Sequence, residues 1–321
     1  MTRVLVTGGA GMIGSAIVRA LLRDPDFEVR VCDQRELPGW IREGAEVQTG
    51  DLREPEQARA AVSGATHVIH CEAIAGEIAN FHRLPYTLTE VNNALCNGII
   101  GAALAEHVER FVYISHAMVF ERATLFPTPE EHLADCPAPR CAYGFSKLTG
   151  EAYCRAAHAQ FGLPYTICRP SNAYGPGGLA DDEPGFAHAV HDLIAKVLAG
   201  QRPLEIFGSG KQTHTLTHVD DIADGVLAAM RSPAGCNEDF NISAADERSV
   251  AEIARIFWEA CGEDPDAFAL EHLPSFPLDV QRRWPSVAKA KRLLGWEARI
   301  GLPEGIAATV RRLREREVAK A

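Results

Sequence analysis

The stretch R-V-L-V-T-G-G-A-G-M-I-G, residues 3–14, decides the fold. Residues 3–7 are mostly apolar and β-branched, which predicts a strand. Three glycines follow at the spacing of a turn into a helix: the first permits the tight turn, the second lets the backbone approach a pyrophosphate, and the third allows close helix packing. Because a helix N-terminus offers N–H donors, the stretch predicts a dinucleotide phosphate site. The residues assigned to that site are Gly8, Gly11, Met12, Ile13 and Gly14.

A carboxylate for the ribose of that dinucleotide stands at Asp33, the end of the second predicted strand. It lies about 20 residues after the glycine turn, where an acidic side chain accepts both hydroxyls of an adenosine ribose. Because this carboxylate would repel a 2′-phosphate, the sequence favours NAD over NADP. Asp51 and Leu52 follow a further strand after the one at residues 28–33, for which no bounds are predicted, and they are assigned to the adenine. A strand-end cap is the structural alternative for Asp33, and an ordinary turn is the alternative for the glycines.

The rest of the first half alternates short strands with helices. The predicted strands cover residues 3–7, 28–33, 67–71, 111–115 and 165–169, and the predicted helices cover residues 14–23, 57–63, 89–106 and 143–162. This alternation is typical of a parallel sheet covered on both faces, so the fold class is α/β, a doubly wound Rossmann sheet. Proline and glycine then break the chain into short pieces, which predicts a smaller C-terminal substrate-binding lobe. We expect domains at residues 1–170 and 171–321, with a strand and a helix returning to the first.

Composition and charge exclude several classes of protein. The chain has 321 residues, 46% apolar and 23% charged, which is ordinary for a globular protein. Its formal net charge of −11 argues against a nucleic-acid partner. With no apolar run of about 20 residues and no signal-peptide pattern, we expect a cytoplasmic protein without membrane contact. Nine cysteines without a C-x-x-C pair predict free thiols, and histidine pairs without a third ligand predict no metal.

A candidate catalytic pair stands in A-Y-G-F-S-K, residues 142–147. Tyr143 and Lys147 are four residues apart at the start of a predicted helix and therefore share one face. The Lys147 ammonium, with the positive nicotinamide of NAD⁺, would lower a tyrosine pKa of about 10 toward neutrality. Tyr143 is then a general base, and both residues are also expected to contact the cofactor. An exposed pair without function is the alternative for this spacing alone.

Eight segments form a pattern that covers nearly the whole chain. They are T-G-G-A-G-M-I-G at 7–14, D-L at 51–52, V-I-H at 68–70, Y-G-F-S-K at 143–147, R-P-S-N-A-Y-G-P at 169–176, G-S-G-K-Q at 208–212, H-V-D-D at 218–221 and L-L-G-W at 293–296. The pattern resembles the extended short-chain dehydrogenase/reductases, specifically the NAD-dependent nucleotide-sugar epimerase/dehydratase family. The resemblance implies bound NAD, a nucleoside-diphosphate sugar in the C-terminal lobe, transient oxidation of that sugar by hydride transfer, and a possible homodimer.

The resemblance also implies substrate-binding residues in the second half of the chain. Asn172 and Arg283 match family positions that contact the substrate diphosphate, and an amide and a guanidinium suit that ligand chemically. His214 stands where the family carries an arginine in Gln-x-Arg. His188, in a loop of the second lobe, is a candidate to reach the sugar. A surface charge is the structural alternative for Arg283.

Departures from the family pattern bear on the chemistry. In S-H-A-M-V-F-E, residues 115–121, His116 occupies the place of the Ser or Thr that hydrogen-bonds the reacting hydroxyl, and Ser115 precedes it. Either His116 shares proton handling with the tyrosine, or it packs behind the site and Ser115 supplies the hydroxyl. Met118 replaces the acidic residue of dehydratases and decarboxylases, which disfavours a 4,6-dehydratase. Residues 72–85 look like the GDP-mannose 3,5-epimerase branch, but the acid–base Cys and Lys of that branch are missing here.

The sequence therefore predicts an NAD-dependent epimerase of a nucleoside-diphosphate sugar, most simply at carbon 4 through a transient 4-keto sugar. The alternatives within the family are a nucleotide-sugar oxidoreductase, decarboxylase or dehydratase. A dinucleotide-binding sensor without catalysis is the alternative of another class. Tyr143 and Lys147 speak against a sensor, because a sensor has no use for a phenolate.

Overall fold

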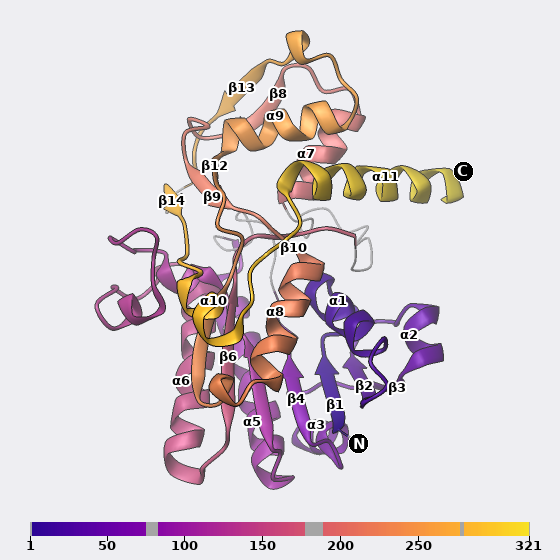
Figure 1. Cartoon of the computed structure of the whole chain (residues 1–321), viewed down its shortest axis with the longest axis vertical. Helices are drawn as coiled ribbons and strands as arrows, with labels where there is room; N and C mark the ends of the chain where they lie inside the picture. Colours follow the sequence, from indigo (N-terminus) through magenta and orange to yellow (C-terminus); the bar gives the residue numbers. More distant parts are fainter. Residues whose placement is uncertain (1, 75–82, 177–188, 277–278, 321) are drawn as a thin grey trace.

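The computed structural model describes residues 2–74, 83–176, 189–276 and 279–320. Its centre is a parallel sheet with helices on both faces (Figure 1). The seven strands lie in the order β11 (Glu238–Ile242), β6 (Tyr165–Pro170), β5 (Arg110–Ile114), β4 (His67–His70), β1 (Thr2–Thr7), β2 (Phe27–Asp33) and β3 (Glu46–Thr49). The prediction of a doubly wound α/β fold is confirmed.

Different helices cover the two faces of the sheet. Along β1, Val4 and Val6 pack on one face and Leu5 packs on the other, because side chains alternate along a strand. The first face is covered by α1 (Met12–Leu21), α8 (Val219–Arg231) and α10 (Ala288–Leu294), and the second by α3 (Pro55–Val62), α5 (Pro85–Ala105) and α6 (Ala142–Phe161). A short helix, α2 (Gly39–Gly44), precedes β3. Both α8 and β11 come from the second half of the chain, yet they lie in these layers.

The strands and helices predicted for the first half lie within two residues of their predicted bounds, except for α5. The helix predicted from residue 89 begins at Pro85, which suits a first helical turn because its missing N–H would have no partner there. Helix α6 ends at Phe161, because Gly162 adopts a φ of 76°, the left-handed conformation that terminates helices. Among the described residues no helix, α5 included, is long and apolar enough to span a membrane.

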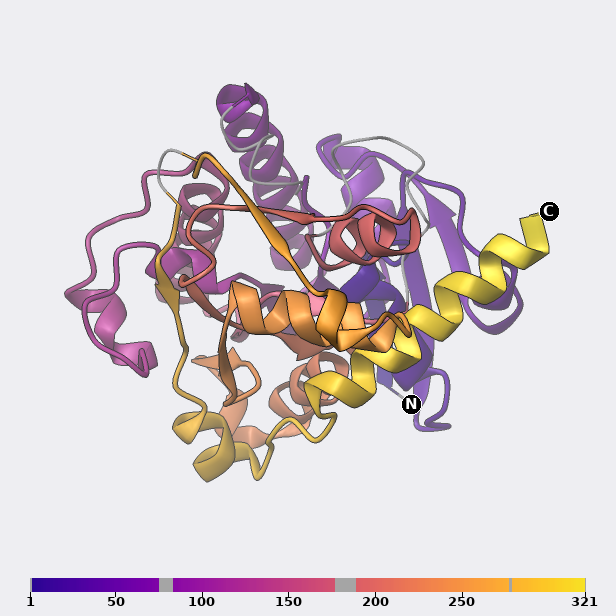
Figure 2. The ribbon, with the colours of Figure 1, turned by 90° about the horizontal axis from the view of Figure 1, so that it is seen from above.

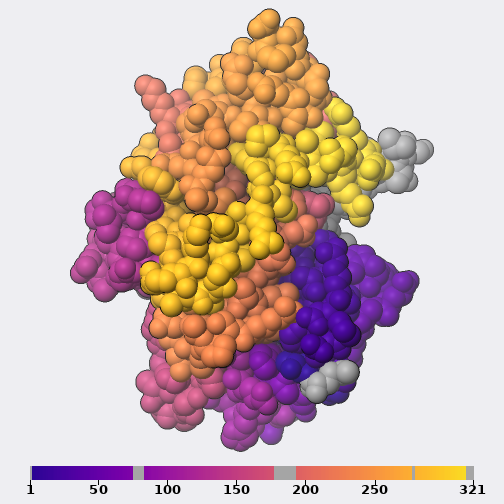
Figure 3. All heavy atoms as spheres, in the orientation of Figure 1, coloured from indigo at the N-terminus to yellow at the C-terminus, as the bar shows by residue number. Residues whose placement is uncertain are grey.

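The second half of the chain also builds a smaller layer above the carboxyl ends of the sheet strands (Figures 1 and 2). Its apolar core surrounds Phe257 and Trp258. The space-filling view shows the last part of the chain, in yellow, extending from this layer down over the lower part of the molecule (Figure 3). The elements of this layer are α7 (Ala189–Leu198), α9 (Val250–Ala260), α11 (Leu302–Lys320), the pairs β7 (Ala173–Tyr174) with β10 (Thr217–His218) and β8 (Leu204–Phe207) with β13 (Leu270–Leu273), and β9 (Thr213–Thr215) between β12 (Glu247–Ser249) and β14 (Arg282–Arg283).

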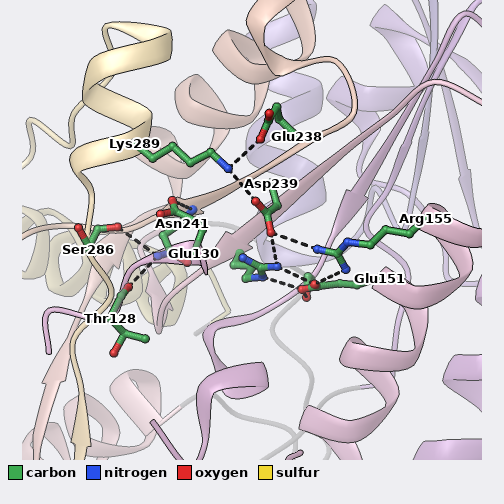
Figure 4. A network of polar contacts seen from close by, with 11 residues as sticks. Thr128, Glu130, Glu151, Arg155, Glu238, Asp239, Asn241, Ser286 and Lys289 are labelled. Atoms are coloured by element: carbon green, nitrogen blue, oxygen red, sulfur yellow. Dashed lines mark hydrogen bonds and ion pairs between the residues drawn. The ribbon is translucent and has the colours of Figure 1, made fainter. Parts of the chain in front are cut away.

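A buried network of charges ties α6 to the sheet (Figure 4). Arg169 of β6 is fully buried and donates to both carboxylate oxygens of Glu151 on α6, each at 2.7 Å. It also donates to Asp239 of β11 at 2.6 Å. Arg155 contacts both carboxylates, and Lys289 of α10 contacts Asp239. Because a buried charge without a partner is strongly unfavourable, these pairs fix α6 relative to β6 and β11.

Candidate active site

The turn between β1 and α1 has room for backbone only. A Cβ atom on Gly14 would lie 2.2 Å from the Gly8 carbonyl oxygen, and Gly8 has a φ of 70° that other residues rarely adopt. Gly11 is the N-cap of α1 and has no side chain to accept from the first-turn N–H groups. Such donors suit a phosphate anion. Met12 and Ile13 pack their side chains on the core, so any phosphate contact would use their backbone.

Asp33 is joined to this turn by hydrogen bonds. Its Oδ2 accepts from the Ala10 N–H at 2.9 Å, and its Oδ1 accepts from the Arg35 N–H at 2.9 Å and from Arg35 Nε at 3.2 Å. The side chain of Asp33 is buried, whereas that of Arg35 is 42% exposed. Sequence reasoning missed Arg35, although a basic residue two positions after the acidic one was a visible signal. Arg35 places a cation on the carboxylate that was expected to repel a 2′-phosphate.

The two residues assigned to the adenine differ in their access to a ligand. The Asp51 carboxylate accepts from Arg53 Nε at 2.9 Å, and this pair lowers the pKa of Asp51. Leu52, in the turn between β3 and α3, is fully buried in the core with residues of α3 and α5. Its side chain is therefore not placed to cover an adenine, contrary to what we expected, and only its backbone remains for contact.

Tyr143 and Lys147 lie together at the start of α6, where Cys141 caps the helix by accepting from the Gly144 N–H at 3.2 Å. Both functional side chains are buried. Lys147 Nζ donates to the Ile114 carbonyl at the end of β5 at 2.8 Å and lies 5.8 Å from the centre of the Tyr143 ring. The hydrogen bond to the end of β5 therefore fixes the position of the Lys147 ammonium beside the Tyr143 phenol.

Burial dominates the electrostatics of Tyr143 and Lys147. Burial raises the pKa of Tyr143, and the opposing charge is that of Arg283. Burial also lowers the pKa of Lys147 to about 8. The expectation that Lys147 and the NAD⁺ nicotinamide together bring the pKa of Tyr143 toward neutrality stays a prediction, because burial is the largest influence on the pKa of each group here.

Ser115 and His116, which directly follow β5, lie in different environments. The Ser115 hydroxyl is buried and donates to Glu151 at 2.7 Å. His116 Nδ1 accepts from the Met118 N–H at 3.0 Å, so in the neutral ring Nε2 carries the hydrogen. The His116 ring packs edge-to-face on Tyr143, with ring centres 5.4 Å apart. The imidazole is thus the neighbour of the phenol, and the serine belongs to the network around Glu151.

Arg283 and Asn172 meet beside this pair although 111 residues separate them. Arg283 Nη1 donates to Asn172 Oδ1 at 2.7 Å, and its Nη2 lies 2.6 Å from Met118 Sδ. Strand β14 holds Arg283 opposite His214 of β9. Burial, and next the Arg283 charge, lower the pKa of His214 to about 3, so its ring is neutral.

Three buried polar atoms in this region have no hydrogen-bond partner in the part of the chain that the structure describes: Arg283 Nε, His214 Nδ1 and Gln212 Oε1. An unbonded buried polar atom is unfavourable, which suits a place that a polar ligand fills. His188 lies outside the described residues. Within the described ranges, no group of three or more His, Cys, Asp or Glu side chains could hold a metal ion.

Comparison with known proteins assigns this site to a family. The model of the NAD dependent epimerase/dehydratase family matches residues 4–243. The chain belongs to that family. A putative UDP-glucose 4-epimerase from Methanocaldococcus jannaschii is 30% identical over 308 residues, which cover 94% of this chain and 95% of that protein. UDP-glucuronic acid decarboxylase 1 from Xenopus tropicalis is 29% identical over 323 residues, which cover 98% of this chain and 72% of that protein.

Solved structures of the epimerase/dehydratase family share the whole fold. UDP-glucose 4-epimerase from Thermotoga maritima, with UDP-glucose, has a TM-score of 0.87 at 28% identity and covers 98% of this chain and 100% of its own. UDP-glucuronic acid 4-epimerase from Bacillus cereus, in complex with UDP-glucuronic acid and NAD, has a TM-score of 0.85 at 26% identity and covers 98% of this chain and 99% of its own.

NAD is the cofactor of this epimerase/dehydratase chain, and the residues present fit it. The glycine turn leaves space for a pyrophosphate, and Asp33 offers a carboxylate next to that turn. Sequence reasoning missed Glu151, which holds Ser115. The signal was present, because Glu151 follows Tyr143 and Lys147 at the same four-residue spacing on α6.

Proposed function

We propose that this protein is an NAD-dependent epimerase that inverts carbon 4 of a nucleoside-diphosphate sugar through a transient 4-keto sugar. The observation that carries the proposal is an acid–base cluster of Tyr143, Lys147 and His116 beside the Arg283–Asn172 pair. The cluster handles a sugar hydroxyl, and the guanidinium fork suits a diphosphate. The names of the M. jannaschii and T. maritima relatives agree with this reaction class.

In the proposed reaction Tyr143 takes the proton of the 4-hydroxyl and later returns it. Its side chain is buried, which keeps water away from the keto intermediate. Lys147, fixed by the Ile114 carbonyl, holds a positive charge beside the phenol and favours its ionised form. NAD, when bound, accepts the hydride of carbon 4 and gives it back. The overall reaction is redox-neutral and needs no net oxidant.

In this proposal His116 donates a hydrogen bond to the sugar oxygen. Because Nδ1 accepts from the Met118 N–H, Nε2 carries the hydrogen of the neutral ring and would be the donor to a substrate oxygen. Met118 itself offers neither an acid for loss of water nor a carboxylate. Its thioether, in contact with Arg283, is the feature that separates this site from dehydration and decarboxylation.

A decarboxylase is the second candidate, and the similarity to the X. tropicalis enzyme favours it. The two functions separate in one experiment. Proton NMR follows the purified protein with catalytic NAD and a panel of UDP-glucose, UDP-glucuronic acid and UDP-N-acetylglucosamine. An epimer that accumulates without net NADH supports the proposal. A pentose product with release of carbon dioxide indicates decarboxylation. No product with any of the three sugars contradicts both an epimerase and a decarboxylase of these UDP sugars.

We also propose a homodimer in a reducing, cytoplasmic compartment. Tyr86 of α5 is 79% exposed, and Phe145 and Tyr153 of α6 are exposed on the neighbouring helix, so the α5–α6 face offers apolar area for a second copy.

The nine cysteines are free thiols, which suits a reducing compartment. Size-exclusion chromatography with light scattering tests the dimer: a monomer in wild type contradicts it, and Phe145→Glu is expected to shift a dimer to monomer.

A further inference from the structure

Glu72 lies against the glycine turn, two residues after the end of β4. A Cβ atom on Gly8 would lie 2.8 Å from the Glu72 Cα and amide nitrogen, so the backbone of Glu72 borders the turn that receives the diphosphate. Its Oε1 accepts a long hydrogen bond of 3.4 Å from Gln34 Nε2. Its Oε2 is buried and has no hydrogen-bond partner among the described residues. The carboxyl group is therefore held in place on one side only.

The charges that face Glu72 are mostly negative. Burial is the main cause that raises the pKa of Glu72, to about 7, and Asp33 at the end of β2 and Asp51 after β3 raise it further. Arg35 opposes them more weakly. Cys32 of β2 is also close, and Glu72 contributes to holding its thiol protonated, with a pKa of about 12. Three carboxyl groups thus gather where a dinucleotide brings further negative charge.

We propose that Glu72 is a dinucleotide-contacting residue that binds NAD in its protonated form and donates its O–H to an oxygen of the dinucleotide. An ionised Glu72 would repel the diphosphate across a partly buried site, whereas the protonated acid offers a donor to an anion. The proton comes from solvent and returns to it when NAD leaves. Binding of NAD is therefore accompanied by uptake of one proton wherever the free protein holds Glu72 as a carboxylate.

This inference concerns the cofactor, not the sugar, so it stands or falls separately from the 4-epimerase proposal. The free acid is mostly protonated at pH 6 and mostly ionised at pH 8. Uptake is then about 0.1 proton per NAD at pH 6 and about 0.9 at pH 8. Over the same range the affinity for NAD weakens by roughly tenfold, because the competent form is depleted.

Isothermal titration calorimetry of the full chain with NAD tests this directly, after any co-purified dinucleotide has been removed. Titrations at pH 8 in phosphate, HEPES and Tris, which differ in ionisation enthalpy, give the protons taken up from the slope of the observed enthalpy. Glu72→Gln keeps the size and an N–H donor but holds no proton to exchange. We expect it to bind NAD without uptake at pH 8, about tenfold more tightly than wild type, and within about twofold of wild type at pH 6.

Glu36→Gln is the matched control, because Glu36 is an exposed carboxylate of the neighbouring loop, paired with Arg42. It should behave as wild type in every buffer. Uptake below about half a proton by wild type at pH 8 overturns the proposal without any variant. Uptake that persists in Glu72→Gln also overturns it, because the proton then belongs to another group. Circular dichroism checks that the variant is folded.

Discussion

His116→Ala should lower the rate of epimerisation far more than Ser115→Ala. The His116 ring packs edge-to-face on Tyr143, with ring centres 5.4 Å apart. The Ser115 hydroxyl instead donates a hydrogen bond of 2.7 Å to Glu151. A positioned acid–base or donor group contributes at least about 10²-fold, or roughly 3 kcal/mol of transition-state stabilisation. Loss of the serine hydroxyl removes one buried hydrogen bond, about 1 kcal/mol of stability, without touching the reacting atoms.

A structural contribution of His116 has to be separated from the chemical one. Its Nδ1 accepts from the Met118 N–H at 3.0 Å, so alanine also removes this cap of a short helical turn, a loss of about 1 kcal/mol of folding stability. Asparagine is the matched control, because its side-chain oxygen can accept the same N–H. We expect His116→Asn to regain the stability of wild type and to remain slow.

The assay is proton NMR or a coupled measurement of kcat on the sugar that the panel identifies, with thermal unfolding in parallel. We expect kcat to fall by about 10²-fold in His116→Ala and by less than about fivefold in Ser115→Ala. The reverse ranking would refute the reasoning, because Ser115 would then supply the catalytic hydroxyl. Full activity in His116→Asn together with a slow His116→Ala would show that only the cap matters.

Three further outcomes follow from the same geometry. Tyr143→Phe should abolish turnover, to below about 1% of wild-type kcat, while calorimetry finds NAD affinity within about threefold, since one oxygen is lost; a rate of several per cent would place the base elsewhere. Arg35→Ala should weaken NADP binding about tenfold relative to NAD, because it removes the cation on Asp33, and unchanged NADP affinity in calorimetry would contradict this. Glu151→Gln should lower the free energy of unfolding by about 3 to 5 kcal/mol, because it breaks a fully buried ion pair with Arg169, and an unshifted urea midpoint would show that the network is not needed.

The sheet and its cofactor turn could be predicted because their signals are local. Residues 3–14 hold a strand, a turn and a helix start in one stretch, and the four-residue spacing of Tyr143 and Lys147 already puts them on one helix face. Even the missed start of α5 had a local signal in Pro85. The failure at Leu52 was of another kind, because a sequence motif does not tell on which side of the backbone a residue at a strand end is buried.

The substrate side of the site depends on contacts between distant parts of the chain. Arg283 reaches Asn172 across 111 residues, and it does so because β14 pairs with β9 and brings Arg283 opposite His214. Short strands of two or three residues carry too little hydrophobic pattern to be recognised from the sequence. Only the resemblance to a family connected these residues before the structure did.

The protonation states of Tyr143 and Lys147 depend on their burial and on the neighbouring charges more than on the spacing of the two residues. Burial raises the pKa of Tyr143 and lowers that of Lys147 to about 8, so near pH 7 a neutral phenol lies beside a mostly charged ammonium. A neutral phenol is a proton donor, which suits the return of the keto sugar to an alcohol. The forward step needs a base, and Arg283 supplies only part of the positive charge that a phenolate requires. We therefore expect the base strength of Tyr143 to depend on bound NAD⁺, whereas the Tyr–Lys spacing in the sequence predicts only the position of that base.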